Sequence, residues 1–221
     1  LVDQDISDAE LPYMGCREIT VCGGLRARIF RISFSRELAY EIAVPTRYGD
    51  ALIRELVEQG REFDAVVYGT EALGVMRVEK GHVAGNELNG QSTALNMGLG
   101  KMVSKKKDSI GMVLSQREGM NDPNGYRLVG VKPVDPAQKL TAGSHFLEKG
   151  AAPVIANDLG WLTSVVYSPH LGCSIALGYL KKGDERRGQR LRAANLLAGA
   201  EVEVEIVSPH FFDPEGERLR G

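Results

Sequence analysis

The second half of the chain consists of short apolar and β-branched runs separated by turns, and this pattern restricts the possible folds more than any other feature. The runs occupy residues 126–133, 146–147, 153–155, 162–167, 173–179 and 202–207. Short strands at this spacing are typical of a small antiparallel barrel or sandwich, in which turns join successive strands. The sequence therefore predicts a domain of this kind in the C-terminal half.

The first half mixes strands with helices. Two runs rich in β-branched and apolar residues, 18–22 and 25–35, flank a Gly-Gly pair, which predicts a hairpin. Thr46 is a suitable N-cap for a helix whose apolar positions continue to the glycine at position 60. A second helix is predicted from Thr70 to Lys80, because a glycine follows it directly. This half therefore has α+β character.

A turn-rich segment at residues 118–124 contains few apolar side chains and marks the expected domain boundary. We therefore expect an α+β part over residues 1–118 and a β domain over residues 119–221. With 221 residues the chain is long enough to bury a substantial core in either arrangement.

Residues 38–44 alternate between two kinds of side chain, which is the signature of a strand with one buried face. The apolar set is Leu38, Tyr40, Ile42 and Val44. Glu41 lies on the other face between Ala39 and Ala43, and these small neighbours leave open space beside its carboxylate. Either solvent or a flat polar ligand can fill this space, so an exposed strand with a solvated Glu41 is the alternative interpretation.

Composition excludes several classes of function. The net charge of -2 offers no basic field for nucleic acid or an anionic membrane, so neither is an expected partner. The three cysteines have no metal-site spacing and are interpreted as reduced thiols of a cytoplasmic protein. No apolar run is long enough to predict a secretory signal or a membrane span. Because the chain begins at Leu1, we expect it to be a piece of a longer protein.

Common catalytic motifs are missing from the sequence. It contains no P-loop, no GxGxxG after a predicted strand and no GxSxG elbow. The four histidines are far apart, so we expect no metal site. These observations argue against a self-contained hydrolase or metalloenzyme.

Three longer segments carry a family resemblance. They are RISFSRELAYEIAVP at 31–45, ALGVMRVEKGHVAGNEL at 72–88 and SPHLGCSIALGYL at 168–180. In this order they resemble successive motifs of the glycine-cleavage T-protein (aminomethyltransferase) family, whose members bind tetrahydrofolate. The resemblance implies the C-terminal part of an aminomethyltransferase-like folate-binding fold, followed by a small antiparallel β-barrel.

Three further segments are similar to one branch of this family, the folate domain of sarcosine oxidase alpha subunits. They are YGTEALGVMRVEKG at 68–81, LGLGKMVSKKKDSIG at 97–111 and VSPHFFDPEGERLRG at 207–221. The resemblance implies that tetrahydrofolate captures here, as 5,10-methylenetetrahydrofolate, the one-carbon unit of sarcosine oxidised elsewhere. It also implies partner subunits, an N-terminal remainder of the same subunit, and FAD, FMN, NAD and zinc bound outside these residues.

The resemblance also suggests roles for individual residues. Glu41 matches the family glutamate that binds the pterin ring, Phe34 matches an aromatic residue of the same pocket, and Tyr40 is its neighbour. A carboxylate can accept both the ring N–H and the exocyclic amino group of a pterin. The second motif adds three more candidates, Arg77, Asn86 and Glu87.

These second-motif residues have structural alternatives. Arg77 and Glu79 can be two neighbouring charges on one helix, whereas Asn86 and Glu87 can cap a turn after Gly85. Both alternatives remain open from the sequence alone.

The sequence departs from the family pattern at three positions. Arg36 replaces a glycine, and Leu73 replaces a folate-contacting arginine of the aminomethyltransferases, which argues against that enzyme itself. His82 stands where the iron–sulfur assembly branch has a cysteine. No catalytic residue is assigned, because the acidic Asp of the reaction centre is expected upstream of Leu1, and we expect the fragment alone to be inactive.

Two other functions remain as alternatives. The chain can be the folate domain of an aminomethyltransferase or of an enzyme like dimethylglycine dehydrogenase. It can also be a non-catalytic module that buries surface against partner subunits.

Overall fold

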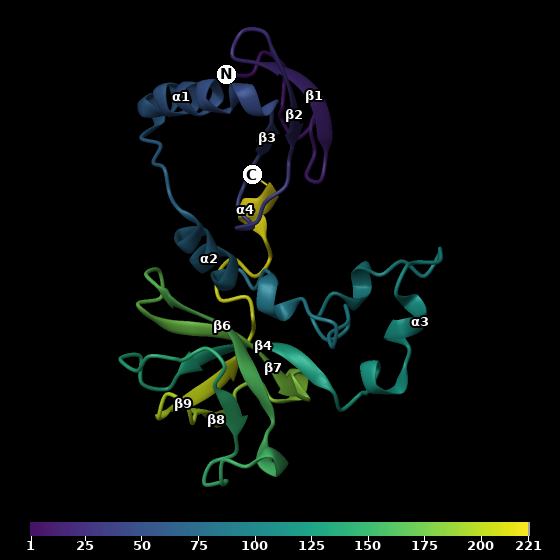
Figure 1. Cartoon of the computed structure of the whole chain (residues 1–221), viewed down its shortest axis with the longest axis vertical. Helices are drawn as coiled ribbons and strands as arrows, with labels where there is room; N and C mark the ends of the chain where they lie inside the picture. Colours follow the sequence, from purple (N-terminus) through teal and green to yellow (C-terminus); the bar gives the residue numbers. More distant parts are fainter. Residues whose placement is uncertain (221) are drawn as a thin grey trace. The chain divides into compact units, whose positions relative to one another are not determined.

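The computed structural model describes residues 1–220, and the chain divides into two compact units (Figure 1). The first, here called the N-terminal unit, comprises Leu1–Met76 and the segment that begins at Asp213. The second, here called the barrel unit, comprises Arg77–Phe212. The sequence-based boundary at residue 118 stays a prediction.

The N-terminal unit contains a three-stranded antiparallel sheet with the order β1-β2-β3. Its strands are β1 (Cys16–Val21), β2 (Leu25–Phe30) and β3 (Glu41–Ala43). The predicted hairpin is confirmed, and Cys22 and Gly23 in its turn have φ values of 52° and 69°, a conformation in which glycine costs little. The core contains Leu11, Ile19, Val21, Ala27, Ile29 and Leu52.

A helical segment follows β3. It consists of η1 (Thr46–Tyr48), α1 (Gly49–Gly60) and η2 (Arg61–Phe63), and α4 (Glu217–Arg220) lies near the C-terminus. The helix itself is confirmed, but the predicted N-cap is wrong, because Thr46 begins the short 3₁₀ turn and Tyr48 occupies the N-cap without a side-chain bond. Leu52 is the apolar residue of α1 that is buried in the core.

The alternation around Glu41 is confirmed for the residues nearest to it. Tyr40, Ile42 and Val44 pack against the core, whereas Glu41 and Ala43 are exposed. Leu38 departs from the prediction and is exposed, because the ordered strand begins only at Glu41.

Arg36, which replaces the family glycine, has an unusual backbone conformation. Arg36 has a φ of 56°, in the left-handed region that favours glycine. The turn before β3 therefore adopts a conformation that the expected family glycine would adopt more easily.

The second predicted helix is confirmed as α2 (Thr70–Glu79), which ends before Gly81 with its φ of 67°. The following segment is built from short elements. These are η3 (Gly85–Glu87), η4 (Gly100–Met102), α3 (Met112–Ser115) and η5 (Glu118–Met120).

The barrel unit is closed by six antiparallel strands in the order β4-β7-β6-β5-β8-β9. They are β4 (Tyr126–Pro133), β5 (His145–Leu147), β6 (Gly160–Ser168), β7 (Cys173–Lys181), β8 (Arg190–Asn195) and β9 (Ala200–Val207). The prediction of a small antiparallel barrel is confirmed, as is the α+β class. Side chains such as Val131, Phe146 and Ile206 fill the interior.

Two details of the barrel differ from the sequence prediction. Residues 153–155 do not form a strand, because the chain enters the 3₁₀ turn η6 (Ile155–Asn157) there. Strand β8 was not predicted, although Arg190 and Arg192 alternate there with the buried Leu191 and Ala193. A further 3₁₀ turn, η7 (Gly183–Glu185), precedes β8.

Among the described residues, helices fall short of the length and apolar character required to cross a bilayer.

Candidate functional site

The exposed face of β3 is the candidate site of the N-terminal unit. Glu41 pairs with Phe30 across the β2–β3 ladder, and Ala43 pairs with Arg28. Directly opposed residues of an antiparallel pair share a face, so these four side chains lie together. The Arg28 guanidinium carbon is 6.0 Å from the centroid of the Phe30 ring. The face therefore presents a carboxylate, an aromatic ring and a cation around the small Ala43.

Phe30 and Arg28 were not predicted as site residues. Their position follows from the hairpin register, which places them opposite Glu41 and Ala43. The sequence signal was present, because residues 25–30 alternate with the same period as β3. It could not be used without knowing which residues pair.

Phe34 and Tyr40 have different surroundings within the same unit. Phe34 is 41% exposed in the segment between β2 and β3, so its ring is accessible to a ligand. Tyr40 packs against the core, and its hydroxyl donates to the carbonyl oxygen of Ile6 at 3.2 Å. Tyr40 therefore supports β3 from the face opposite Glu41.

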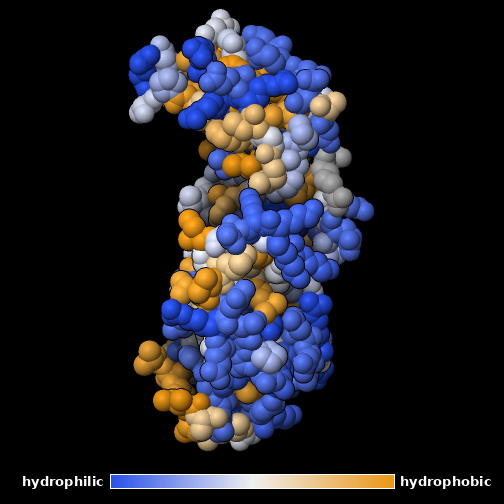
Figure 2. Space-filling model, turned by 90° about the vertical axis from the view of Figure 1, so that its right-hand side faces the viewer, coloured by the Kyte–Doolittle hydropathy of each residue, from blue (hydrophilic) through white to orange (hydrophobic). Residues whose placement is uncertain are grey.

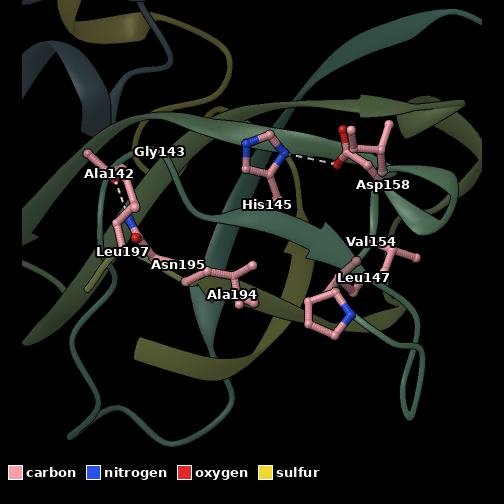
Figure 3. A pocket seen from close by; sticks show the side chains of 12 residues that line it. Ala142, Gly143, His145, Leu147, Val154, Asp158, Ala194, Asn195 and Leu197 are labelled. Atoms are coloured by element: carbon pink, nitrogen blue, oxygen red, sulfur yellow. Dashed lines mark hydrogen bonds and ion pairs between the residues drawn. The ribbon is translucent and has the colours of Figure 1, made fainter. Parts of the chain in front are cut away.

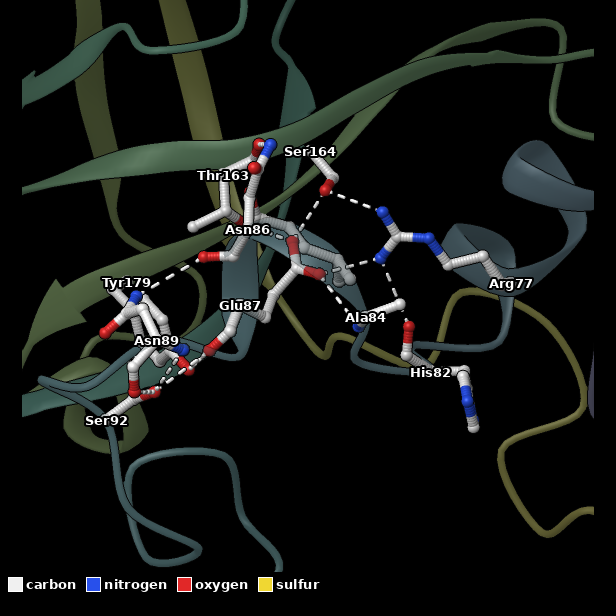
Figure 4. A network of polar contacts seen from close by, with 11 residues as sticks. Arg77, His82, Ala84, Asn86, Glu87, Asn89, Ser92, Thr163, Ser164 and Tyr179 are labelled. Carbon is white, nitrogen blue, oxygen red and sulfur yellow. Dashed lines mark hydrogen bonds and ion pairs between the residues drawn. The ribbon is translucent and has the colours of Figure 1, made fainter. Parts of the chain in front are cut away.

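A separate candidate site, within the barrel unit, is a buried polar network (Figure 4). Its centre is Glu87, whose side chain is 0% exposed. One carboxylate oxygen, Oε2, accepts from the Arg77 guanidinium at 2.8 Å and from the Ala84 backbone N–H at 3.1 Å. The other, Oε1, accepts from the hydroxyls of Thr163 at 2.5 Å and Ser164 at 2.6 Å.

These four donors explain how an ionised carboxylate can be buried. Arg77 supplies the compensating charge, and its second nitrogen donates to the Ser164 hydroxyl at 2.7 Å. A buried carboxylate is tolerated when it is both paired and hydrogen-bonded. Because each oxygen of Glu87 already has two donors, the carboxylate is used to hold the protein together at this point.

Neighbouring contacts attach the same segment to the barrel wall. The Asn86 carboxamide donates to the carbonyl oxygen of Thr163 at 3.0 Å, and the Tyr179 hydroxyl donates to the carbonyl oxygen of Glu87 at 2.7 Å. Burial raises the pKa of Tyr179, with a smaller increase from the nearby charge of Glu87 and a decrease from the hydrogen bond with Ser92. The η3 segment is therefore fixed to β6 and β7.

The six predicted site residues thus fall into two groups. Glu41, Phe34 and Tyr40 belong to the N-terminal unit, and Arg77, Asn86 and Glu87 are brought together in the barrel unit.

Arg77 and Glu79 both lie on α2, as the structural alternative has it, and each contacts a different segment of the chain. Arg77 forms its ion pair with Glu87, whereas Glu79 accepts from the Ser168 hydroxyl at 2.5 Å. Thr163 and Ser164 were missed by sequence reasoning. Their signal was a pair of hydroxyl residues inside an otherwise apolar strand, where buried polar groups require partners.

A cavity of about 460 Å³ lies near the β5 and β8 strands of the barrel and is lined mainly by apolar residues (Figure 3). Its main polar contact joins His145 Nδ1 to Asp158 Oδ1 at 3.0 Å. Exposed apolar side chains at its rim include Ile155 and Leu197. In Figure 2 hydrophobic residues gather at the lower end of the view. None of the six predicted site residues lines this cavity.

Over residues 1–220, no three or more His, Cys, Asp or Glu side chains are grouped so that they could hold a metal ion. All three cysteines are free thiols, with Cys16 and Cys22 exposed and Cys173 buried.

Comparison with known families agrees with this architecture. Residues 1–107 match the model described as "GCVT N-terminal domain", and residues 127–213 match "Glycine cleavage T-protein C-terminal barrel domain". The second match covers most of the closed barrel. The chain belongs to the glycine-cleavage T-protein family.

Within this family the chain is similar to sarcosine oxidase alpha subunits. It is 46% identical to "Sarcosine oxidase subunit alpha" of Rhizobium meliloti (strain 1021), over 99% of this chain and 22% of that protein. It is 37% identical to the protein of the same name from Corynebacterium sp. (strain P-1), over 98% of this chain and 22% of that protein. The chain therefore spans about a fifth of the length of these relatives.

A solved structure supports the fold. The glycine cleavage system aminomethyltransferase T from Bartonella henselae superimposes with a TM-score of 0.72 at 22% identity. The match covers 93% of this chain and 54% of that one. The chain therefore has an aminomethyltransferase-like fold.

Proposed function

We propose that the chain is the tetrahydrofolate-binding part of a sarcosine oxidase alpha subunit. In this function the one-carbon unit from oxidised sarcosine is captured as 5,10-methylenetetrahydrofolate. The observation that carries the proposal is the exposed carboxylate of Glu41, which stands beside an aromatic ring on an open strand face. The 46% identity to a sarcosine oxidase alpha subunit over nearly the whole chain supports the choice of enzyme.

The β3 face fits a pterin ring in its chemistry. A pterin presents a ring N–H and an amino group side by side, and one carboxylate can accept both. Glu41 can do this because no hydrogen bond or ion pair from the described residues occupies its carboxylate. Phe30, paired with Glu41, and the exposed ring of Phe34 offer flat apolar surface for stacking.

The other predicted residues are proposed to support the backbone of their own units. Tyr40 holds β3 against the core through its ring and its bond to Ile6. Arg77, Asn86 and Glu87 fix the η3 segment through their mutual contacts and through β6. Direct contact of these four residues with folate remains a prediction.

In this proposal the chain contributes binding and orientation. Bound tetrahydrofolate supplies the nitrogen nucleophiles that accept the one-carbon unit. Glu41 restricts the rotation of the pterin ring, and holding reacting atoms in place converts an encounter between molecules into a step within one complex. In the same proposal, flavin on another subunit oxidises sarcosine.

The proposal includes the wider assembly. The remainder of the alpha subunit and the other sarcosine oxidase subunits are the partners, and FAD, FMN and NAD are bound by them. The free thiols support a cytoplasmic location, where cysteines stay reduced.

The test is tetrahydrofolate binding by the complete protein, measured by calorimetry with Glu41→Gln. Charge-assisted hydrogen bonds contribute about 1.5–3 kcal/mol each, so the affinity should fall by at least about tenfold. The matched control is Glu203→Gln, which removes another exposed strand carboxylate, on β9. Equal affinities of Glu41→Gln and the unmodified protein would refute the assignment of Glu41. Absence of tetrahydrofolate binding by the unmodified protein would refute the function and favour a subunit-interaction module.

A further inference from the structure

A second cavity in the barrel unit has an aromatic wall that the proposed function does not use. Its volume is about 430 Å³, within the range of small-molecule pockets of about 300–1,000 Å³. Tyr126, Trp161 and Tyr179 from β4, β6 and β7 form the wall. The Trp161 ring centroid lies 5.0 Å from that of Tyr126 and 5.7 Å from that of Tyr179.

Tyr179, one residue of this wall, is held by a hydrogen bond. The Tyr179 hydroxyl donates to the carbonyl oxygen of Glu87, and the hydroxyl of Ser92 donates to the same oxygen at 3.0 Å. Figure 4 shows Asn89, Ser92 and Tyr179 gathered on the side of Glu87 away from Arg77. The cavity wall is therefore rigid at Tyr179, which reduces the entropy lost when a ligand binds.

The cavity is also lined by polar residues and by a positive charge. Asn89 and Gln91 line it after η3, and Arg117 lines it from the segment before Met120. Within residues 1–220, the Arg117 guanidinium and the Gln91 carboxamide have no hydrogen bond or ion pair. Two groups able to bind a ligand therefore line the same cavity as the aromatic wall without competing protein partners.

The charged side chains in and near the cavity indicate which class of ligand it can bind. No Asp or Glu is among the residues that line the cavity. The Lys181 ammonium, 5.9 Å from the centroid of the Tyr126 ring, adds a second positive charge nearby. Asp158 is close enough to raise the pKa of Tyr126, after the larger effect of burial, but its Oδ1 already interacts with His145 and the Gly160 N–H. The lining therefore favours an anion over the cations that aromatic cages bind.

We propose that the cavity lined by Trp161 and Arg117 binds a planar aromatic carboxylate. The aromatic ring packs against Tyr126 and Trp161, and the carboxylate accepts hydrogen bonds from Arg117, whose planar guanidinium matches carboxylate geometry. The carboxamide of Gln91 donates to the same carboxylate. This site belongs to the barrel unit and is independent of the Glu41 proposal.

Benzoate is the probe, because it is the simplest planar aromatic carboxylate. Trp161 is the single tryptophan of the chain, so its fluorescence reports on the cavity wall directly. We expect saturable quenching by benzoate in the full chain. Cyclohexanecarboxylate keeps the charge without a flat ring, and benzamide keeps the ring without the charge. Both should bind at least about tenfold more weakly, since each lacks one of the two contacts.

The matched variants are Arg117→Gln and Arg187→Gln, which remove the same charge inside and outside the cavity. Arg187 is exposed in the turn after η7 and does not line the cavity. We expect Arg117→Gln to weaken benzoate binding at least about tenfold and Arg187→Gln to leave it unchanged. Fluorine NMR line broadening of para-fluorobenzoate by the complete protein and by both variants gives a second measurement.

Three results would overturn the proposal. They are the absence of saturable quenching together with unchanged fluorine line widths, equal binding of benzoate and cyclohexanecarboxylate, and equal binding by the Arg117→Gln and Arg187→Gln variants. Tetrahydrofolate binding through Glu41 is measured separately, so failure of either proposal is distinguishable from failure of the other.

Discussion

Replacing Glu87 with glutamine should unfold the barrel unit much more easily. The Glu87 carboxylate is fully buried and accepts from Arg77, Ala84, Thr163 and Ser164. Glutamine has nearly the same shape, but it leaves the Arg77 charge without its partner. In addition, the amide NH2 of glutamine replaces one carboxylate oxygen. It cannot accept the two hydrogen bonds that this oxygen accepted, because an NH2 group is itself a donor.

The magnitude follows from the burial of the pair. Glu87 is 0% and Arg77 13% exposed at the side chain. Removing one partner of a buried ion pair costs about 3–5 kcal/mol, because the other charge is left uncompensated. With a urea m-value of about 2 kcal/mol/M, a loss of about 4 kcal/mol lowers the unfolding midpoint by about 2 M.

Urea unfolding followed by circular dichroism measures this loss. The control is Glu201→Gln, because Glu201 pairs with Arg192 at 2.6 Å but is 54% exposed at the side chain. An exposed pair contributes at most about 1 kcal/mol. If Glu87→Gln cost no more than Glu201→Gln, the buried network would not stabilise the unit as argued. A double-mutant cycle with Arg77→Met should further show coupling between the two residues.

Two other measurements test the surroundings of the network and the backbone. Burial raises the pKa of Tyr179 in the folded protein. The neutral Tyr179 side chain therefore contributes its full stabilisation below the ordinary tyrosine pKa of about 10. This stabilisation is lost as the pH rises through the higher pKa of the folded state. Urea titrations at increasing alkaline pH should therefore show a loss of stability that is smaller in Tyr179→Phe, and an unchanged loss would contradict this cause. Lys182 has a φ of 53°, and Lys182→Gly should raise the unfolding free energy by about 0.5–1 kcal/mol by removing left-handed strain. Lys182→Ala is the control and should give no such gain.

Much of the fold was predictable because local patterns carry the relevant information. The period-2 alternation of residues 40–44 placed Glu41 on the exposed face of β3, and the predicted α2 differs from the observed helix by one residue. Strand β8 was missed, because its alternation of arginines with Leu191 and Ala193 covers only a few residues. Its place became clear only through pairing with β5 and β9.

Some candidate site residues were likewise predictable from local sequence and others were not. Glu41 could be identified from its neighbours in the sequence, because its exposure depends on the alternation of a single strand. Glu87 looked equally available, yet it is buried by Thr163 and Ser164, which lie 76 and 77 residues further along the chain. No periodic pattern links residues so far apart.

The amino-acid sequence by itself therefore determined the types of element, the antiparallel barrel and the exposed carboxylate on β3. These properties depend on the spacing of apolar side chains and on glycines near turns, which act over a few residues. Tertiary structure alone decided that Glu87 is paired with Arg77 and that Trp161 and Arg117 line the same cavity. Such partners meet only when the barrel closes, because closure fixes which distant strands and connecting segments become neighbours.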